Sequence, residues 1–233
     1  MQRRNSYFVA LRERMVSMRP FEPDKVAIAE LTMKLRGMGV TDTRLLRALE
    51  LVPRRMFVAA SHQASAYLDR SLPIECGQTI NAPSTVALMV SALGVGPEDK
   101  VLDVGCGSGF QAAILAHLAA QVVTMDRFRS LIDIAEDLLS ALKISNVITL
   151  LGDGLEGFTR HAPYNRILVD GAVEKVPTAL LDQLADKGML VAPVGAGHTQ
   201  TLVRISRDGR LFHRAELGKI RQFPLREGVA RRL

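Results

Sequence analysis

At 233 residues, the chain is long enough for one well-cored domain with a small appendage. Hydrophobic residues make up 48% of the sequence and charged residues 23%, a balance that excludes an intrinsically disordered chain. The formal net charge of +6 is uneven: residues 1–35 hold seven Lys/Arg against four Asp/Glu, residues 201–233 hold nine against three, and residues 36–200 hold 14 against 17. Basic ends suit either an anionic partner or an ordinary solvated surface.

No segment of the sequence predicts a membrane anchor or a secretory signal. The longest apolar run, residues 112–123, contains His117 and Gln121 and is too short to span a bilayer, and the first residues are mixed and charged. The two cysteines, Cys76 and Cys106, form no Cys-x-x-Cys pair, so neither a metal site nor a disulfide framework is expected. A cytoplasmic location is therefore expected.

The first hundred residues predict helices separated by one long irregular segment. Helices are expected over residues 24–37, from residues 41–43 to residue 52, and over residues 83–93. Residues 54–82 are mixed and marked by Pro and Gly, so they predict mostly loop.

From residue 100, short apolar runs alternate with helical stretches. Strands are expected over residues 101–104, 121–125, 147–151, 166–169 and 189–192, and helices from 110 to about 119, over 128–142 and over 177–185. This alternation predicts an α/β fold with a mostly parallel, doubly wound sheet. Apolar runs at 201–206 and 211–216 flank Asp208-Gly209, a strong hairpin signal, so antiparallel strands are expected at the C-terminal edge.

A glycine-rich loop follows the first expected strand and precedes a helix. It consists of Gly105-Cys106-Gly107-Ser108-Gly109, and glycines are needed where backbone turns tightly and approaches a ligand. Asp126, which closes the next strand, lies at the spacing from Gly105 at which a carboxylate accepts hydrogen bonds from ribose hydroxyls. Asp153 ends the third strand, where its carboxylate could accept from an adenine amino group. The three strand ends meet at the edge where open α/β sheets bind ligands.

Two nucleotide cofactors compete for this loop. The dinucleotide fingerprint G-x-G-x-x-G requires a glycine where the chain has Phe110, and Asp103 inside the strand disfavours a pyrophosphate but attracts a cation. S-adenosylmethionine carries an amine, a sulfonium and an adenosine, so it is the expected cofactor. The residues expected to hold it are Asp103, Gly105, Cys106, Gly107, Ser108, Gly109, Asp126, Arg127, Asp153 and Gly154.

Motifs on both sides of the loop resemble the protein-L-isoaspartate O-methyltransferase family over roughly residues 30–225. They are Leu51-Val52-Pro53-Arg54-Arg55-Met56-Phe57-Val58, Ala66-Tyr67-Leu68-Asp69, Gly77-Gln78-Thr79-Ile80-Asn81-Ala82-Pro83, Pro193-Val194-Gly195 and Arg221-Gln222-Phe223-Pro224-Leu225. The resemblance implies a Rossmann-like methyltransferase fold over residues 26–233, with an N-terminal helical extension at 1–25. It also implies methyl transfer from S-adenosylmethionine to isoaspartyl carboxylates of damaged proteins, with Gln78, Thr79 and Asn81 at the acceptor site.

The chain departs from the family pattern at two places near that site. Asn81 stands where the family usually has a substrate-facing serine, and Asp170 adds a carboxylate to a stretch that is usually built of small residues. An acceptor carboxylate is already ionised at neutral pH, so methyl transfer needs alignment and exclusion of water rather than a general base. Because an Asn amide can donate the hydrogen bond that a serine would give, isoaspartyl methylation is the leading hypothesis.

Two other functions stay open at this point. One is a methyltransferase of the same fold that acts on RNA or a small molecule, for which Asp170 would be a base or an orienting acceptor and the basic ends would attract RNA. The other is a non-catalytic protein that binds S-adenosylmethionine. Damaged proteins or peptides are the favoured partners, with nucleic acid less favoured and a membrane not expected.

Overall fold

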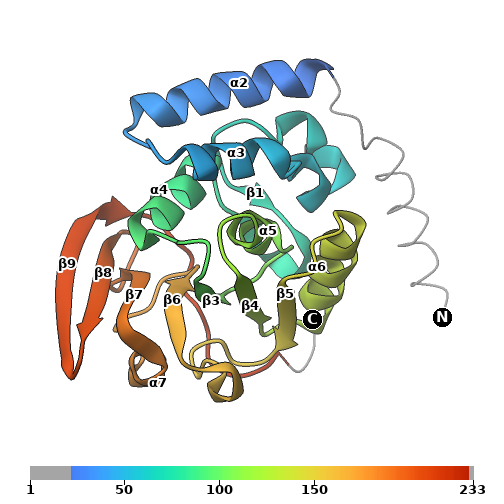
Figure 1. The fold of residues 1–233 in the computed structure, drawn as a ribbon. Helices are drawn as coiled ribbons and strands as arrows, with labels where there is room; N and C mark the ends of the chain where they lie inside the picture. The colour runs from blue at the N-terminus through green and yellow to red at the C-terminus, as the bar shows by residue number, and fades with distance from the viewer. Residues whose placement is uncertain (1–21, 231–233) are drawn as a thin grey trace.

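The computed structural model describes residues 22–230, so all but the last four residues of the expected N-terminal extension lie outside the described part. A seven-stranded sheet forms its centre, in the order β5-β4-β3-β6-β7-β8-β9 (Figure 1). The strands are β3 (Lys100–Val104), β4 (Gln121–Asp126), β5 (Val147–Leu151), β6 (Tyr164–Val169), β7 (Leu184–Val194), β8 (Gln200–Asp208) and β9 (Leu211–Ile220). Strands β3 to β7 pair in parallel, whereas β8 and β9 are antiparallel, which confirms the predicted mixed sheet.

The central strands are apolar because both faces of the sheet are covered. Val101, Leu102 and Val104 of β3 are buried, as parallel strands between two helical layers require. Strand β9 lies at the edge, and its side chains are exposed up to Ile220. The hairpin turn between β8 and β9 contains Gly209, whose φ of +59° suits the left-handed region that glycine enters freely.

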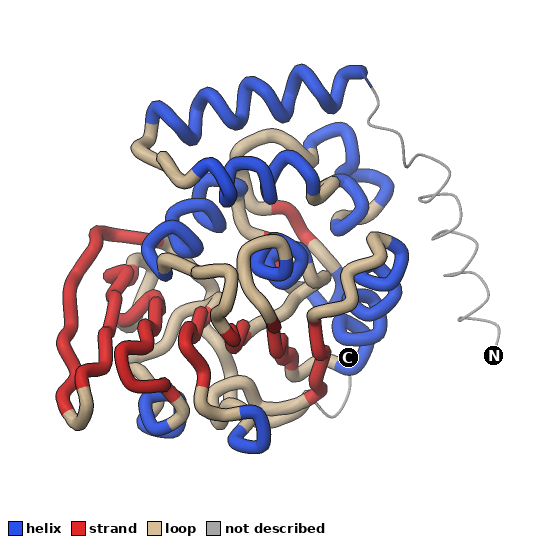
Figure 2. The backbone as a smooth tube through the Cα atoms, in the orientation of Figure 1, coloured by secondary structure: helices blue, strands red, loops and turns tan. Residues whose placement is uncertain are grey.

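Helices cover the two faces unequally, as Figures 1 and 2 show. One face is covered by α4 (Pro83–Leu93), α5 (Phe110–Ala116) and α6 (Arg129–Ala141), with α2 (Glu22–Gly37) and α3 (Thr43–Leu51) packed outside them. Helix α3 begins at Asp42, whose side chain accepts hydrogen bonds from the amides of Arg44 and Leu45. The other face carries α7 (Thr178–Asp182) and the 3-10 turn η4 (Thr159–His161). Among residues 22–230, no helix has the length and apolar character needed to cross a membrane.

Two expectations differ from the structure in detail. The helix expected over 177–185 ends at Asp182, because Leu184 already pairs with Tyr164 in the sheet. The segment 54–82 is irregular as predicted but ordered by short elements: the 3-10 turns η1 (Arg54–Phe57), η2 (Ala60–Ser65) and η3 (Glu75–Gly77), and a small sheet of β1 (Leu72–Pro73) and β2 (Thr79–Ile80).

The order of the strands reverses beside β3. Strand β4 pairs on one side of β3 and β6 on the other, so the chain crosses over between them. The carboxyl ends of these three strands meet, and a ligand crevice is expected there.

Candidate active site

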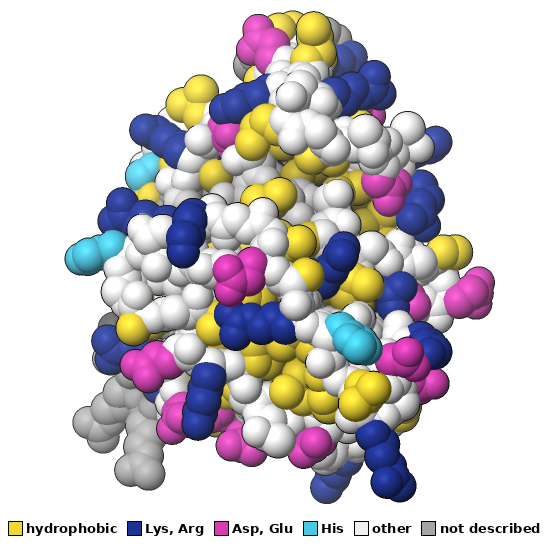
Figure 3. All heavy atoms as spheres, turned by 90° about the vertical axis from the view of Figure 1, so that its left-hand side faces the viewer, with side chains coloured by type: hydrophobic (Ala, Val, Ile, Leu, Met, Phe, Trp, Pro, Cys, Tyr) yellow, Lys and Arg dark blue, Asp and Glu magenta, His cyan; other side chains and the backbone are white. Residues whose placement is uncertain are grey.

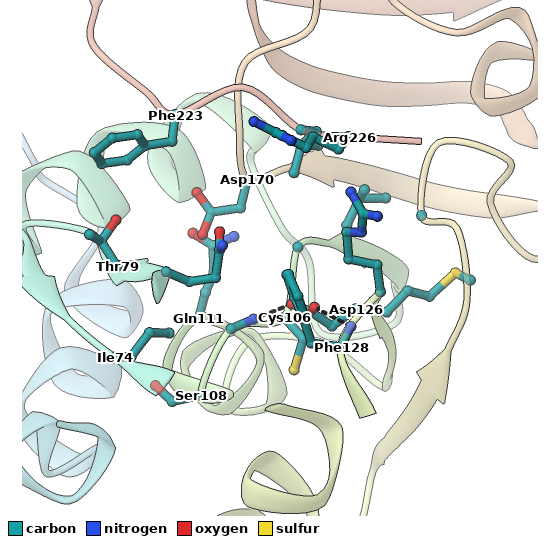
Figure 4. Close-up of a pocket in the computed structure, with 18 of the residues that line it drawn as sticks. Ile74, Thr79, Cys106, Ser108, Gln111, Asp126, Phe128, Asp170, Phe223 and Arg226 are labelled. Carbon is teal, nitrogen blue, oxygen red and sulfur yellow. Dashed lines mark hydrogen bonds between the residues drawn. The ribbon is translucent and has the colours of Figure 1, made fainter. Parts of the chain in front are cut away.

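A pocket of about 580 Å³ opens at the carboxyl ends of β3, β4 and β6, within the size range of small-molecule sites. Its walls come from separate parts of the chain, and Figure 4 shows their side chains converging on one space. Most of the residues that form it lie in segments 74–81, 104–111, 125–128, 153–155 and 222–230, together with Asp170.

The glycine loop forms the floor of the pocket. Gly105, Gly107 and Gly109 have φ angles of +97°, +54° and +92°, which side chains other than glycine rarely adopt. A Cβ atom on Gly105 would lie 2.8 Å from the carbonyl oxygen of Asp170, and one on Gly109 would lie 2.9 Å from the Cβ of Ala135. Glycine is therefore required at both positions for conformation and for space.

The loop turns its backbone amides toward the protein. The amides of Gly105 and Cys106 donate to the carbonyl of Met125, both at 2.9 Å. The amide of Gly107 donates to Asp126 Oδ2 at 2.9 Å, and that of Gly109 donates to the carbonyl of Cys106. These four donors are unavailable to a phosphate, so the loop is not built as a pyrophosphate cradle.

Asp103 lies beneath the pocket rather than on its wall. Its side chain is fully buried and accepts hydrogen bonds from Gln111 Nε2 at 2.9 Å and from Thr124 Oγ1 at 2.7 Å. Burial raises the pKa of Asp103 to about 6, although the two hydrogen bonds act in the opposite direction. Its influence on a ligand passes through Gln111, which lines the pocket and which the sequence analysis did not single out.

Three buried polar atoms of pocket-lining residues lack partners within the protein, and one of them is Nε of Arg127. The hydroxyl of Ser108 and Oε1 of Gln111 make no hydrogen bond within the protein, and both residues are 3% exposed. A buried polar group is normally paired, so these atoms suit a polar ligand. A hydroxyl and an amide oxygen fit the ammonium and carboxylate groups of S-adenosylmethionine.

The acidic residues expected to hold a nucleoside also line the pocket. Asp126 accepts hydrogen bonds from Gly107 and from the amide of Phe128 at 3.0 Å, and burial raises the pKa of Asp126. Asp153 accepts from the amide of Leu155 at 3.0 Å and from that of Gly228 at 2.5 Å. Arg127 and Gly154 line the same region, whereas Gly109 is not on the pocket wall.

The loop with Gln78, Thr79 and Asn81 closes the other end of the pocket. These three residues line it together, and the short pairing of β1 with β2 holds them opposite the glycine loop. Asn81 is 9% exposed, and its Nδ2 donates to Asp170 Oδ1 at 2.5 Å. The structure thus brings Asn81 and Asp170 into contact.

Arg54 holds this loop from behind. Its guanidinium is 1% exposed and donates to the carbonyl of Ala66, to that of Arg70 at 3.1 Å and to that of Asn81 at 2.8 Å. It also lies 5.8 Å from the centre of the Phe110 ring at the start of α5. Burial lowers the pKa of Arg54 to about 10, which leaves it charged at neutral pH. The sequence signal for this role is faint, because Arg54 is one of two adjacent arginines in an apolar motif and the sequence does not distinguish it from Arg55.

The last described segment forms a wall that the sequence analysis did not assign to the site. The amide of Ala172 donates to the carbonyl of Phe223, and the amide of Leu225 donates to the carbonyl of Ala172, which ties the segment beside the end of β6. Gly228 reaches Asp153, and the amide of Ala230 donates to the carbonyl of Arg127. Residues 222–230 therefore lie as a strap across the pocket.

Neither cysteine is built for covalent chemistry or for a metal. Burial raises the pKa of Cys106 well above its ordinary value, and Cys76 also has a raised pKa. Among residues 22–230, no group of three or more His, Cys, Asp or Glu side chains is arranged to hold a metal ion.

Ser108→Ala is expected to weaken binding of S-adenosylhomocysteine roughly fivefold, because one hydrogen bond to the ligand is lost. The free energy of unfolding of the ligand-free protein should instead rise by about 1 kcal/mol, because a buried unpaired hydroxyl is removed. Calorimetry and urea unfolding measure the two effects. Ser91→Ala, at an exposed position of α4, is the matched control. Equal affinities for Ser108→Ala and the control would contradict the assignment.

A loop in which four amides already donate within the protein is not built to cradle a pyrophosphate, and the nearby carboxyl groups of Asp103 and Asp126 favour a cationic ligand. The reversed strand order places that ligand over the sheet edge. Fold and pocket together define a class I, S-adenosylmethionine-dependent methyltransferase with a Rossmann-like fold.

Comparison with known proteins narrows this class. The family model "Protein-L-isoaspartate(D-aspartate) O-methyltransferase (PCMT)" matches residues 27–230. Protein-L-isoaspartate O-methyltransferase of Azorhizobium caulinodans is 47% identical over 210 residues, which cover 90% of this chain and 97% of the relative. The protein of the same name from Parvibaculum lavamentivorans is 47% identical over 218 residues, covering 92% and 97%.

Solved structures agree with the sequence relatives. A protein-L-isoaspartate O-methyltransferase structure superposes with a TM-score of 0.78 at 26% identity, covering 85% of this chain and 65% of that longer one. A Plasmodium falciparum structure, described as a putative protein-L-isoaspartate O-methyltransferase in complex with S-adenosyl-L-homocysteine, shares the fold with a TM-score of 0.72 at 22% identity, covering 84% and 97%.

The chain belongs to the protein-L-isoaspartate(D-aspartate) O-methyltransferase family. It is an S-adenosylmethionine-dependent enzyme that methylates the carboxyl group of isoaspartyl residues in damaged proteins or peptides.

Proposed function

We propose that the two ends of the pocket divide this reaction between them, with the cofactor over the glycine loop and the isoaspartyl carboxylate against Asn81. The observation that carries the proposal is that Gln78, Thr79 and Asn81 line the same cavity as Gly105 and Ser108. An acceptor and a methyl donor bound there would lie side by side, and such alignment is the main requirement of this transfer.

The glycine loop end suits each part of the cofactor. Ser108 and Gln111 offer unpaired polar atoms for the ammonium and carboxylate groups, and Asp126 offers its remaining lone pairs to ribose hydroxyls. Met125, Phe128 and Leu155 provide an apolar wall for the adenine ring. When bound, S-adenosylmethionine supplies a methyl group on a cationic sulfur that leaves as a neutral thioether.

The acceptor end orients a group that is already nucleophilic. An isoaspartyl carboxylate is ionised at neutral pH, so no side chain needs to remove a proton from it. The amide nitrogen of Asn81 has two donors, and one of them is engaged by Asp170. The second donor is available to hold the acceptor carboxylate while the surrounding walls exclude water.

The test uses labelled S-adenosylmethionine and two peptides that differ only in an isoaspartyl or an aspartyl residue. Methyl incorporation into the isoaspartyl peptide alone is the expected result. Background incorporation into both peptides would overturn the assignment of the acceptor end. Calorimetry with S-adenosylhomocysteine, run in parallel, reports separately on the cofactor end.

Methylation of RNA receives no support from the face that carries β8 and β9. Figure 3 shows this side, on which Lys and Arg side chains are interspersed with acidic and apolar ones. A phosphate backbone is bound by a continuous basic surface, which this face does not present.

The domain organisation follows from the same site. We infer that residues 26–233 form the methyltransferase domain and that residues 1–25 are an extension to it. Pocket walls come from positions as far apart as Ile74 and Ala230, which supports a single domain across that span. Both cysteines are free thiols, and a reducing cytoplasmic compartment suits them.

A further inference from the structure

The contact between Asn81 and Asp170 joins two positions 89 residues apart in the chain. Asn81 Nδ2 lies 2.5 Å from Asp170 Oδ1, and both residues line the pocket. By the resemblance given under Sequence analysis, Asn81 takes the place of a serine and Asp170 lies in a stretch usually built of small residues. Because the two residues touch, they are interpreted as one unit.

Asp170 is held firmly where it stands. Its amide donates to the carbonyl of Val104 at 2.7 Å, and its own carbonyl oxygen lies against Gly105. Figure 4 shows its carboxyl group pointing into the same space as Thr79 and Phe223. An acceptor placed against Asn81 would therefore also meet the Asp170 carboxyl group.

Two carboxyl groups would then lie close together, so the charge of each one matters. An ionised Asp170 would repel an isoaspartyl carboxylate at contact distance. Two carboxyl groups at one site normally share a single proton, and the more buried group retains it. Asp170 is partly buried at the pocket wall, whereas the acceptor belongs to a surface segment of another molecule.

The groups around Asp170 also decide its charge. Burial raises the pKa of Asp170 well above its ordinary value, and the charges of Asp103 on β3 and Asp126 on β4 raise it further, while the Asn81 hydrogen bond lowers it. Cys106 is a buried neutral thiol beside these groups. Arg127 and Arg226 line the same pocket, and their charges, together with that of a bound sulfonium, would favour ionisation of Asp170. The negative charge of the incoming acceptor carboxylate acts in the other direction and raises the pKa of Asp170.

We propose that Asp170 binds the acceptor as a neutral carboxylic acid: Asn81 holds one oxygen, and the O–H on the other donates to the isoaspartyl carboxylate. This inference rests on the proposed function of the acceptor end. The pair thereby presents one O–H donor to the acceptor carboxylate. During transfer the acceptor oxygen bonds to the methyl carbon as the sulfur–carbon bond breaks, and the proton stays on Asp170.

The proposal predicts the direction in which kcat/KM changes with pH. Asp170 donates below its pKa in the complex and repels the acceptor above it, so kcat/KM for the isoaspartyl peptide should fall as pH rises. Asp170→Asn cannot ionise and its amide donates a hydrogen bond, so it should lack this alkaline fall. Asp170→Ala has neither the donor nor the charge, so it should raise KM roughly tenfold at pH values below the pKa of Asp170, where one hydrogen bond to a charged group is lost, and it should also lack the alkaline fall.

The experiment measures initial rates of S-adenosylhomocysteine formation between pH 6 and pH 9.5 for wild type, Asp170→Asn and Asp170→Ala. Asp182→Asn, an exposed acid on α7, is the matched control and should follow wild type. A flat wild-type profile, or an Asp170→Asn profile that falls like wild type, would overturn the inference while leaving the proposed function intact. Absence of isoaspartyl methylation in wild type at every pH would overturn both.

A second measurement tests whether the two residues act together. Asn81→Ser should lower kcat/KM about tenfold, because Asp170 loses the partner that orients it, and Asp170→Ala should do the same. The double variant Asn81→Ser/Asp170→Ala replaces the pair with a single hydroxyl donor and should return to within about threefold of wild type. A roughly 100-fold loss in the double variant, the product of the two single losses, would refute a shared role.

Discussion

Gly105→Ala is expected to lower kcat/KM by roughly 100-fold and to abolish measurable binding of S-adenosylhomocysteine. The new Cβ would lie 2.8 Å from the carbonyl oxygen of Asp170, and the backbone has a φ of +97°. The loop or the end of β6 must move, and either shift displaces the cofactor floor from the acceptor end. Calorimetry with S-adenosylhomocysteine measures the first effect, and methylation of an isoaspartyl peptide measures the second.

Gly39→Ala separates this clash from backbone strain. Gly39 has a φ of +92°, but a Cβ there would meet nothing within 4 Å, and the residue lies outside the pocket. It should lose about 1–2 kcal/mol of unfolding free energy from strain and keep its cofactor affinity. If Gly105→Ala bound S-adenosylhomocysteine as well as Gly39→Ala, the close approach at the loop would not matter for binding.

Arg54→Met is expected to lower the free energy of unfolding by about 3 kcal/mol and to raise KM for the peptide acceptor. Three backbone carbonyls lose a charged donor in the interior, and leaving buried acceptors unpaired is costly. One of those carbonyls belongs to Asn81, so the acceptor loop loses its support from behind. Affinity for S-adenosylhomocysteine should change much less, because Arg54 touches the cofactor side through the Phe110 ring alone.

Urea unfolding and peptide kinetics check this prediction. Arg54→Lys should recover part of the stability, since an ammonium donates hydrogen bonds but lacks the fork that reaches three carbonyls. Arg129→Met is the control: its side chain is 64% exposed and forms a weak pair with Asp133, so it should change stability by less than about 0.5 kcal/mol. An unaltered peptide KM in Arg54→Met would refute the support role.

The alternating part of the fold was predictable because its signals are local. Apolar runs and glycine punctuation define β3 through β5 to within a residue or two, and Asp208-Gly209 predicts the hairpin of β8 and β9. The position of the cofactor pocket follows from the topology, since carboxyl ends of neighbouring parallel strands must meet.

What the sequence could not supply depends on contacts between distant segments. Segment 54–82 is ordered by the buried guanidinium of Arg54, which donates to carbonyls 12, 16 and 27 residues away. Nothing in the sequence indicates that Gln111 donates a hydrogen bond to Asp103. The hydrogen bond between Asn81 and Asp170 joins positions 89 residues apart and is seen only in the folded chain. Periodicity reports which face is buried, but not which side chains meet across the core.

The strap affects the order in which the walls of the pocket form during synthesis. Residues 222–230 are synthesised after every other wall of the pocket, and Gly228 and Ala230 must reach back to Asp153 and Arg127. The sheet and helices can assemble earlier, because chains fold from the N-terminus during synthesis. A nascent chain therefore completes the wall of its cofactor pocket only after residues 222–230 have been synthesised and have folded back onto Asp153 and Arg127.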